Sequence, residues 1–76
     1  FRLYVMYEQE FQQIGLNIKK FRKREGITQQ ILADKIDKSL NFVGKIEVGF
    51  DHPSLYTLID IAKALNVSLK DLFEDV

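Results

Sequence analysis

The stretch TQQILADKIDKSLNFVGKIEVG, residues 28–49, decides the fold because it predicts two short helices joined by a tight turn. Thr28 and Ser39 each provide a hydroxyl of the kind that accepts a backbone hydrogen bond at a helix N-terminus. The two helices are expected over about residues 29–36 and 39–47, and the apolar side chains of each share one face. The residues expected to be buried are Leu32, Ala33, Ile36, Val43 and Ile46.

The sequence on either side predicts three more helices and no strand. They are expected over about residues 11–24, over about 54–65, and after Ser68, which has the spacing of a capping box with Asp71. The apolar faces of the two longer helices are formed by Phe11, Ile14, Ile18, Phe21, Leu55, Leu58, Ile61, Ala62 and Leu65. Residues that tolerate the left-handed backbone conformation stand at three expected helix ends: Gly26, Gly49 and Asn66. The predicted fold class is therefore all-α, a compact five-helix bundle.

The composition limits what such a small bundle can do. The chain has 76 residues, no cysteine and one histidine, so nearly every apolar side chain is needed for the core and little remains to wall a deep substrate cleft. We therefore expect no enzyme activity, no cofactor and no metal site. No apolar run approaches the roughly 18 residues of a membrane helix, and we expect a cytoplasmic protein. Residues 11–76 are expected to form one domain, preceded by an N-terminal arm over residues 1–10.

The charges are unevenly distributed, although they sum to zero. Five of the six residues from Lys19 to Arg24 are cations, a density typical of a surface that contacts nucleic acid or of a solvated helix face. On a helical wheel Arg22 alone of these borders the apolar stripe, and Glu47 leans inward on its own helix in the same way. We therefore expect Arg22 and Glu47 to form a buried bidentate ion pair between the two helices.

The outer face of the helix over residues 39–47 is available to contact a partner. Asn41 and Lys45 lie on this face, flanked by Phe42 and Gly44, while Leu40 lies at its edge. Asparagine can form two hydrogen bonds with adenine, lysine can donate to guanine or phosphate, and phenylalanine can touch the methyl group of thymine. A tight turn followed by a helix with a free polar face is typical of a helix-turn-helix that enters the major groove of DNA.

The chain resembles the Cro/C1-type, or XRE-like, helix-turn-helix family of bacterial and phage transcriptional regulators. The resemblance covers about residues 14–73 without a gap, and its motifs in register are Gly26-Ile27-Thr28-Gln29, Leu32-Ala33, Ile46-Glu47 followed by Gly49, and Pro53-Ser54-Leu55. It implies a five-helix fold of the lambda-repressor-like type. It also implies a repressor or autoregulatory controller that binds double-stranded operator DNA, usually as a homodimer on a palindrome. Arg22 and Glu47 match the family's internal ion pair.

The resemblance implies where the DNA is contacted. Gln29 matches the family's phosphate-contacting glutamine, with a base at the groove edge also within reach, so its loss is expected to weaken binding to all sequences evenly. Ser39 is expected to hold a phosphate at the start of the recognition helix, whereas Leu40, Asn41 and Lys45 match positions that face base edges. The other residues expected at the interface are Thr28, Gln30, Phe42, Gly44 and His52.

Two departures from the family pattern keep another class of function open. Asp51 stands where a basic or polar residue is common, and the recognition helix is unusually apolar. The alternative is a protein-interaction or antitoxin-like module that binds a protein partner through an exposed apolar surface of Leu40, Phe42, Phe50 and Tyr56. For dimerisation the sequence favours a C-terminal surface of Leu69, Phe73 and Val76, with Leu72 expected to complete the core of the monomer.

Overall fold

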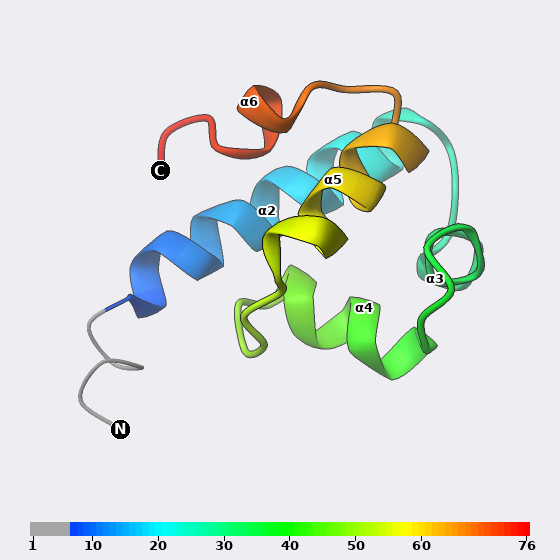
Figure 1. Ribbon diagram of the computed structural model, residues 1–76, viewed down its shortest axis with the longest axis horizontal. Helices are drawn as coiled ribbons and strands as arrows, with labels where there is room; N and C mark the ends of the chain where they lie inside the picture. Colours follow the sequence, from blue (N-terminus) through cyan, green and yellow to red (C-terminus); the bar gives the residue numbers. More distant parts are fainter. Residues whose placement is uncertain (1–6) are drawn as a thin grey trace.

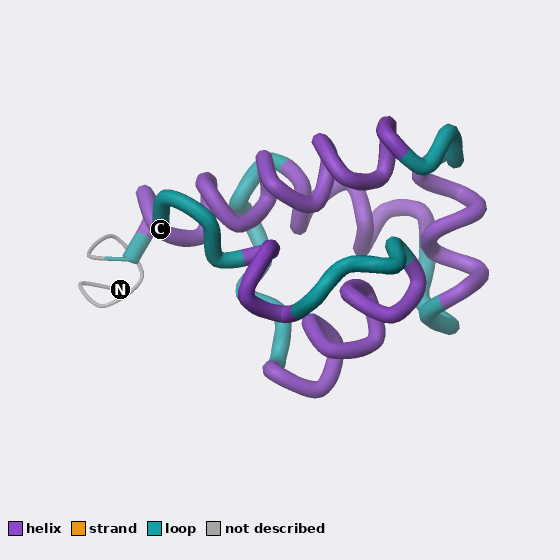
Figure 2. The backbone as a smooth tube through the Cα atoms, turned by 90° about the horizontal axis from the view of Figure 1, so that it is seen from above, coloured by secondary structure: helices purple, strands orange, loops and turns teal. Residues whose placement is uncertain are grey.

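The computed structural model describes residues 7–76, which form five α-helices and no strand (Figure 1). In chain order the helices are α2 (Glu8–Arg24), α3 (Gln29–Lys35), α4 (Leu40–Glu47), α5 (Leu55–Ala64) and α6 (Leu69–Leu72). The long helix α2 packs against α4 and α6, while α3 packs against α4 and α5. Seen from above, only short loops connect the helices (Figure 2). The expected all-α, five-helix fold is confirmed for the residues that the structure describes.

The four helices that follow α2 begin where the sequence places an N-cap. Each N-cap hydroxyl accepts a hydrogen bond from the backbone N–H three residues further on, at 3.0–3.2 Å; the caps are Thr28, Ser39, Ser54 and Ser68. At α6 the Asp71 carboxylate also accepts from the backbone N–H of Ser68 at 3.0 Å, which completes the expected capping box. Such caps supply partners for N–H groups that have none inside a helix, and they fix where each helix starts.

Three helix ends have the left-handed backbone conformation that the sequence predicts, and a fourth has it without having been predicted. Gly26 and Gly49 adopt φ angles of 73° and 81°, and Asn66 adopts 58°, so all three expected ends are left-handed. Asp37 ends α3 in the same conformation, with φ of 57°, although no glycine or asparagine stands at this helix end. Aspartate is among the few residues that visit this region readily.

One hydrophobic core holds the described helices together. Its buried members are Ile14, Ile18, Phe21, Leu32, Ala33, Ile36, Val43, Ile46, Leu58, Ile61, Ala62, Leu65 and Leu72. Leu72 is fully buried and belongs to the core, as expected. Gly15 lets α2 and α4 approach closely, because a Cβ atom there would lie against the carbonyl oxygen of Ile46 and 2.6 Å from that of Glu47. The end of α4 is thus fixed on α2.

Three expectations about the elements are wrong in detail. The first helix begins at Glu8 instead of residue 11, and since no side chain caps it, the sequence has no signal for its start. Leu55 was expected in the core but is 57% exposed, because side chains lean toward the N-terminus of a helix and those of the first turn project past its end. Phe42 is half-buried against the core, since on the wheel it lies only about 40° from Ile46. Residues 1–6 of the expected arm lie outside the described residues.

A buried asparagine, which the sequence reading missed, ties the C-terminal segment to α2. Asn17 is 3% exposed, and its Nδ2 donates to the carbonyl oxygens of Leu72 and Glu74 at 2.9 and 2.8 Å. Its Oδ1 accepts from Gln13 at 3.0 Å, so every polar atom of the side chain has a partner. Lys20 and Glu74 add an exposed ion pair at 2.9 Å. No helix within residues 7–76 is both long and apolar enough to span a membrane.

Candidate nucleic-acid interface

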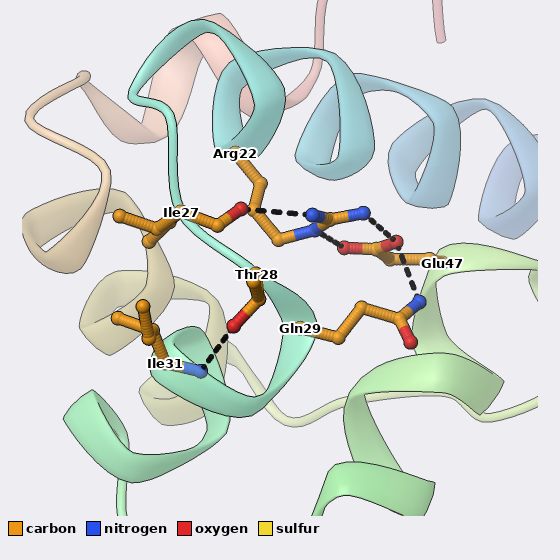
Figure 3. Close-up of polar contacts among 6 residues, drawn as sticks. All are labelled: Arg22, Ile27, Thr28, Gln29, Ile31 and Glu47. Atoms are coloured by element: carbon orange, nitrogen blue, oxygen red, sulfur yellow. Dashed lines mark hydrogen bonds and ion pairs between the residues drawn. The ribbon is translucent and has the colours of Figure 1, made fainter.

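The ion pair expected between Arg22 and Glu47 is formed and lies beneath the candidate interface (Figure 3). The Nε of Arg22 donates to Oε2 of Glu47 at 2.6 Å, and its Nη2 donates to Oε1 at 3.1 Å. The third guanidinium nitrogen, Nη1, donates to the carbonyl oxygen of Ile27 at 2.9 Å. Arg22 and Glu47 are only 8% and 4% exposed. Because the pair is bidentate and shielded from water, it holds the last turn of α4 against α2 in one orientation.

The same carboxylate binds a third donor, from α3. The Nε2 of Gln29 donates to Oε1 of Glu47 at 3.0 Å, so one carboxylate connects three helices (Figure 3). Gln29 is the first residue of α3 and is half-buried. Helical periodicity compares residues within one helix and gives no signal for this contact between α3 and α4. The orientation of Gln29 is therefore a property that only the folded chain reveals.

The expected recognition helix presents its outer face as the sequence indicates. Ser39 and Asn41 are exposed, and Leu40 is 46% exposed, so α4 begins with three accessible side chains. Gly44 and Lys45 follow on the same helix and are half-buried. The Phe42 ring leans toward the core, and the ammonium group of Lys38 lies 5.4 Å from its centroid. The structure thus brings the expected base-facing residues together on one helix, with Phe42 at the margin.

The residues expected to contact the DNA backbone surround this helix. The hydroxyls of Thr28 and Ser39 accept backbone hydrogen bonds as caps, which leaves the hydrogen of each hydroxyl available to donate. Gln30 is exposed, and its Nε2 donates to Asp34 of the next turn at 2.9 Å. His52, in the loop after α4, stacks on the Phe11 ring with centroids 4.0 Å apart. His52 is therefore held against α2 through an aromatic contact that the sequence did not indicate.

The expected dimer surface lies elsewhere on the molecule. Leu69 is half-buried against the core, whereas Phe73 and Val76 are 37% and 51% exposed. In Figure 1 α6 and the turn after it lie on the opposite side of α2 and α5 from α4. A partner bound at this C-terminal surface would leave the outer face of α4 uncovered.

Comparisons with known proteins agree with this geometry. The sequence profile described as helix-turn-helix matches residues 18–72. The chain is 40% identical over 58 residues to the uncharacterized HTH-type transcriptional regulator YqaE of Bacillus subtilis; the match covers 76% of this chain and half of YqaE. It is 38% identical over 58 residues to the uncharacterized HTH-type transcriptional regulator YazB of the same species, and covers 84% of that protein.

Solved structures share the fold as well. The restriction-modification controller protein C.AhdI from Aeromonas hydrophila superposes with a TM-score of 0.84 at 25% identity, covering 88% of this chain and 97% of that chain. The clp gene regulator ClgR from Corynebacterium glutamicum superposes with a TM-score of 0.79 at 26% identity, covering 80% and 65% of the two chains. The helix arrangement described above is therefore shared with two regulators.

Proposed function

Because the chain belongs to the Cro/C1-type helix-turn-helix family of transcriptional regulators, we propose that it binds operator DNA sequence-specifically through α4. The observation that carries this proposal is the two-sided character of α4. Its inner side is fixed by the buried pair of Arg22 and Glu47, while its outer side exposes Leu40 and Asn41. A rigidly held helix with accessible polar side chains is what direct readout in the major groove requires.

Each residue of this face has a chemical role in the proposal. The Asn41 amide forms two hydrogen bonds with adenine, and the ammonium group of Lys45 donates to guanine or to a phosphate. Leu40 and Phe42 pack against thymine methyl groups, and Gly44 lets the groove approach the backbone of α4. Polar side chains around the helix bind the sugar-phosphate backbone and set the register: Thr28, Gln30, Ser39 and His52.

The proposal includes a homodimer that binds a palindromic operator as a repressor or autoregulatory controller. Two copies would place their α4 helices in major grooves about one helical turn apart. The exposed apolar side chains of Phe73 and Val76, next to Leu69, supply the surface that we assign to dimerisation. Among the contact residues assigned above, Lys45 alone is a lysine or arginine, which predicts a shallow salt dependence for the affinity, since few phosphates would be neutralised.

The test is a selection of binding sites from random duplex DNA, followed by titration of the best site over a series of salt concentrations. We expect an enriched palindrome bound at least about a thousandfold more tightly than an unrelated duplex. Asn41→Ala should change the preferred base at one position of each half-site, while Asp60→Ala, exposed on α5, should leave the preference unchanged. Equal, weak binding to every duplex would refute the proposal.

One observation favours a second function, that of a protein-interaction module. Leu40 on α4, Phe50 in the following loop and Tyr56 on α5 are 46%, 58% and 84% exposed, and large exposed apolar side chains can mark a protein-binding surface. In that case Phe42→Ala, at the margin of this surface, would abolish a complex with a protein partner. The affinity for DNA would then stay at the non-specific level for all duplexes in the selection.

A further inference from the structure

The Glu47 carboxylate determines which way the amide of Gln29 points. A carboxylate can only accept hydrogen bonds, so the amide nitrogen of Gln29 must face it and the carbonyl oxygen must face away. Arg22 prevents the carboxylate from turning, because it holds both of its oxygens at 2.6 and 3.1 Å. Gln29 therefore keeps one orientation before any ligand arrives.

The outward oxygen of Gln29 lies beside α4 at a residue that has no side chain. A Cβ atom at Gly44 would be 4.0 Å from Oε1 of Gln29 and would meet no other atom within 4 Å. Gly44 is not among the glycines with a positive φ angle, so neither its backbone conformation nor packing requires glycine there. Glycine is nevertheless unfavourable inside a helix. The consequence of glycine at residue 44 is that no side chain of this residue stands beside the Gln29 oxygen.

We propose that Gln29, held by Glu47 and lying beside Gly44, reads an adenine in the major groove. This inference rests on the proposed function and assigns a base contact to a residue outside α4. An amide oxygen accepts only, and a phosphodiester has no hydrogen to donate, so this oxygen is suited to a base amino group. With one N–H bonded to Glu47, Gln29 retains one N–H and the carbonyl oxygen. These are the two groups that adenine pairs with at N7 and N6.

In this arrangement Glu47 is a positioning residue for DNA recognition. It does not touch the DNA, since its side chain is 1% exposed and surrounded by Arg22 and Gln29. Its effect is to present the Gln29 amide in the orientation that fits adenine and to exclude the reversed one, which fits a different pattern of donors and acceptors. The residue that sets the base preference is therefore buried beneath the residue that makes the contact.

The first experiment is a double-mutant cycle between protein and DNA. Sites selected by the wild type and by Gln29→Met are compared, and the adenine at the position where they differ is replaced by purine deoxyriboside, which lacks only the N6 amino group. We expect this replacement to weaken wild-type binding about five- to tenfold, the scale of one hydrogen bond, and Gln29→Met binding less than twofold. Gln9→Met, exposed on α2, is the control and should behave as the wild type.

The outcomes separate this inference from the proposed function. If no duplex is enriched by the wild type, the proposed function itself fails. If a site is enriched but Gln29→Met weakens all duplexes evenly, Gln29 contacts phosphate and only the inference fails. A wild-type preference for guanine, cytosine or thymine at that position, or an equal effect of the purine replacement on both proteins, also overturns it.

The positioning role of Glu47 has its own test. Arg22 donates to both oxygens of the carboxylate, so the amide introduced by Glu47→Gln sets its NH₂ group against an N–H of Arg22 in either orientation. The group that holds the Gln29 amide is thereby loosened, and the orientation of Gln29 is no longer fixed. The adenine preference should then disappear, whereas a merely structural role would weaken every duplex evenly. Since this variant risks unfolding, exchange of the Gln29 side-chain amide protons with water is also measured by NMR in the free wild type. Slower exchange than for Gln9 supports the proposal, and equal exchange overturns it.

Discussion

Replacing Gly15 or Gly44 by alanine makes the same chemical change in two helices, and the structure predicts opposite effects on stability. Alanine is favoured over glycine inside a helix by about 1 kcal/mol. At Gly44 the new methyl group would meet only Oε1 of Gln29, at 4.0 Å, which is an ordinary contact. The free energy of unfolding of Gly44→Ala should therefore rise by about 0.5–1 kcal/mol.

At Gly15 the same gain is outweighed. The methyl group would lie 2.6 Å and 2.8 Å from the carbonyl oxygen and carbon of Glu47, and backbone atoms cannot rotate away as a side chain can. Separating α2 from α4 also stretches the bridge between Arg22 and Glu47. Overpacking of this kind costs about 1–3 kcal/mol or more, so we expect a net loss of about 2 kcal/mol for Gly15→Ala.

Urea unfolding followed by far-ultraviolet circular dichroism measures both effects. With an m value of about 1 kcal/mol/M for a domain of this size, the two midpoints should differ by about 2–3 M. Gly26→Ala is the control for backbone strain alone, because its φ is 73° and nothing lies within 4 Å of its Cβ position; it should lose about 1 kcal/mol. The reasoning is refuted if Gly15→Ala is as stable as the wild type, or if Gly44→Ala is less stable.

Three further predictions concern the charges and the C-terminal surface. Arg22→Met leaves the Glu47 carboxylate buried without its cation and should lower the free energy of unfolding by about 3–5 kcal/mol; a loss below 1 kcal/mol in urea unfolding would contradict this. Hydrogen bonds with Ser68 hold the pKa of Asp71 below its ordinary value; the bond from the Ser68 backbone N–H has the larger effect and the bond with the Ser68 side chain the smaller one. The ionised Asp71 carboxylate therefore stabilises the folded state. This contribution is fully present above about pH 4, and it is lost as the pH falls through the folded-state pKa of Asp71. Thermal melts of Asp71→Asn should lack this part of the pH dependence, and an unchanged slope would assign it to other carboxylates. If the chain forms the homodimer that we propose, Phe73→Glu should raise its dissociation constant at least about tenfold in sedimentation equilibrium, whereas an unchanged constant would place the interface elsewhere.

The elements that carry local signals could be predicted from the sequence almost to the residue. A hydroxyl at each of four helix starts, and glycine or asparagine at three helix ends, mark features that depend only on neighbouring residues. The pairing of Arg22 with Glu47 was also accessible, because two charged residues on apolar faces both need a partner. The first turn of α2 carries no such cap, so the sequence predicts its start three residues late.

Other hydrogen bonds between side chains of one helix and groups of another segment could not be predicted from caps or helical periodicity. The bond from Gln29 to Glu47 depends on how α3 lies against α4, and the bonds from Asn17 to the carbonyl oxygens of Leu72 and Glu74 join positions more than fifty residues apart. Both involve amide side chains, which are common on solvated helix faces and carry no periodic signal. The helical wheel places Leu55 on the apolar face of α5, but the core reaches only as far as Leu58, and Leu55 at the start of the helix is exposed.

The Glu47 carboxylate of α4 binds side chains of both α2 and α3, so a substitution at one of these three positions changes which residues the other two tolerate. A change of Arg22 or Glu47 alone leaves a buried charge without a partner, although replacing both by apolar residues is often neutral for stability. Such a double replacement would still release the Gln29 amide, and under the proposed recognition it would alter the base that Gln29 reads. In a family alignment we therefore expect residues 22, 29 and 47 to covary. Selection for a particular operator would then constrain two residues that never touch DNA.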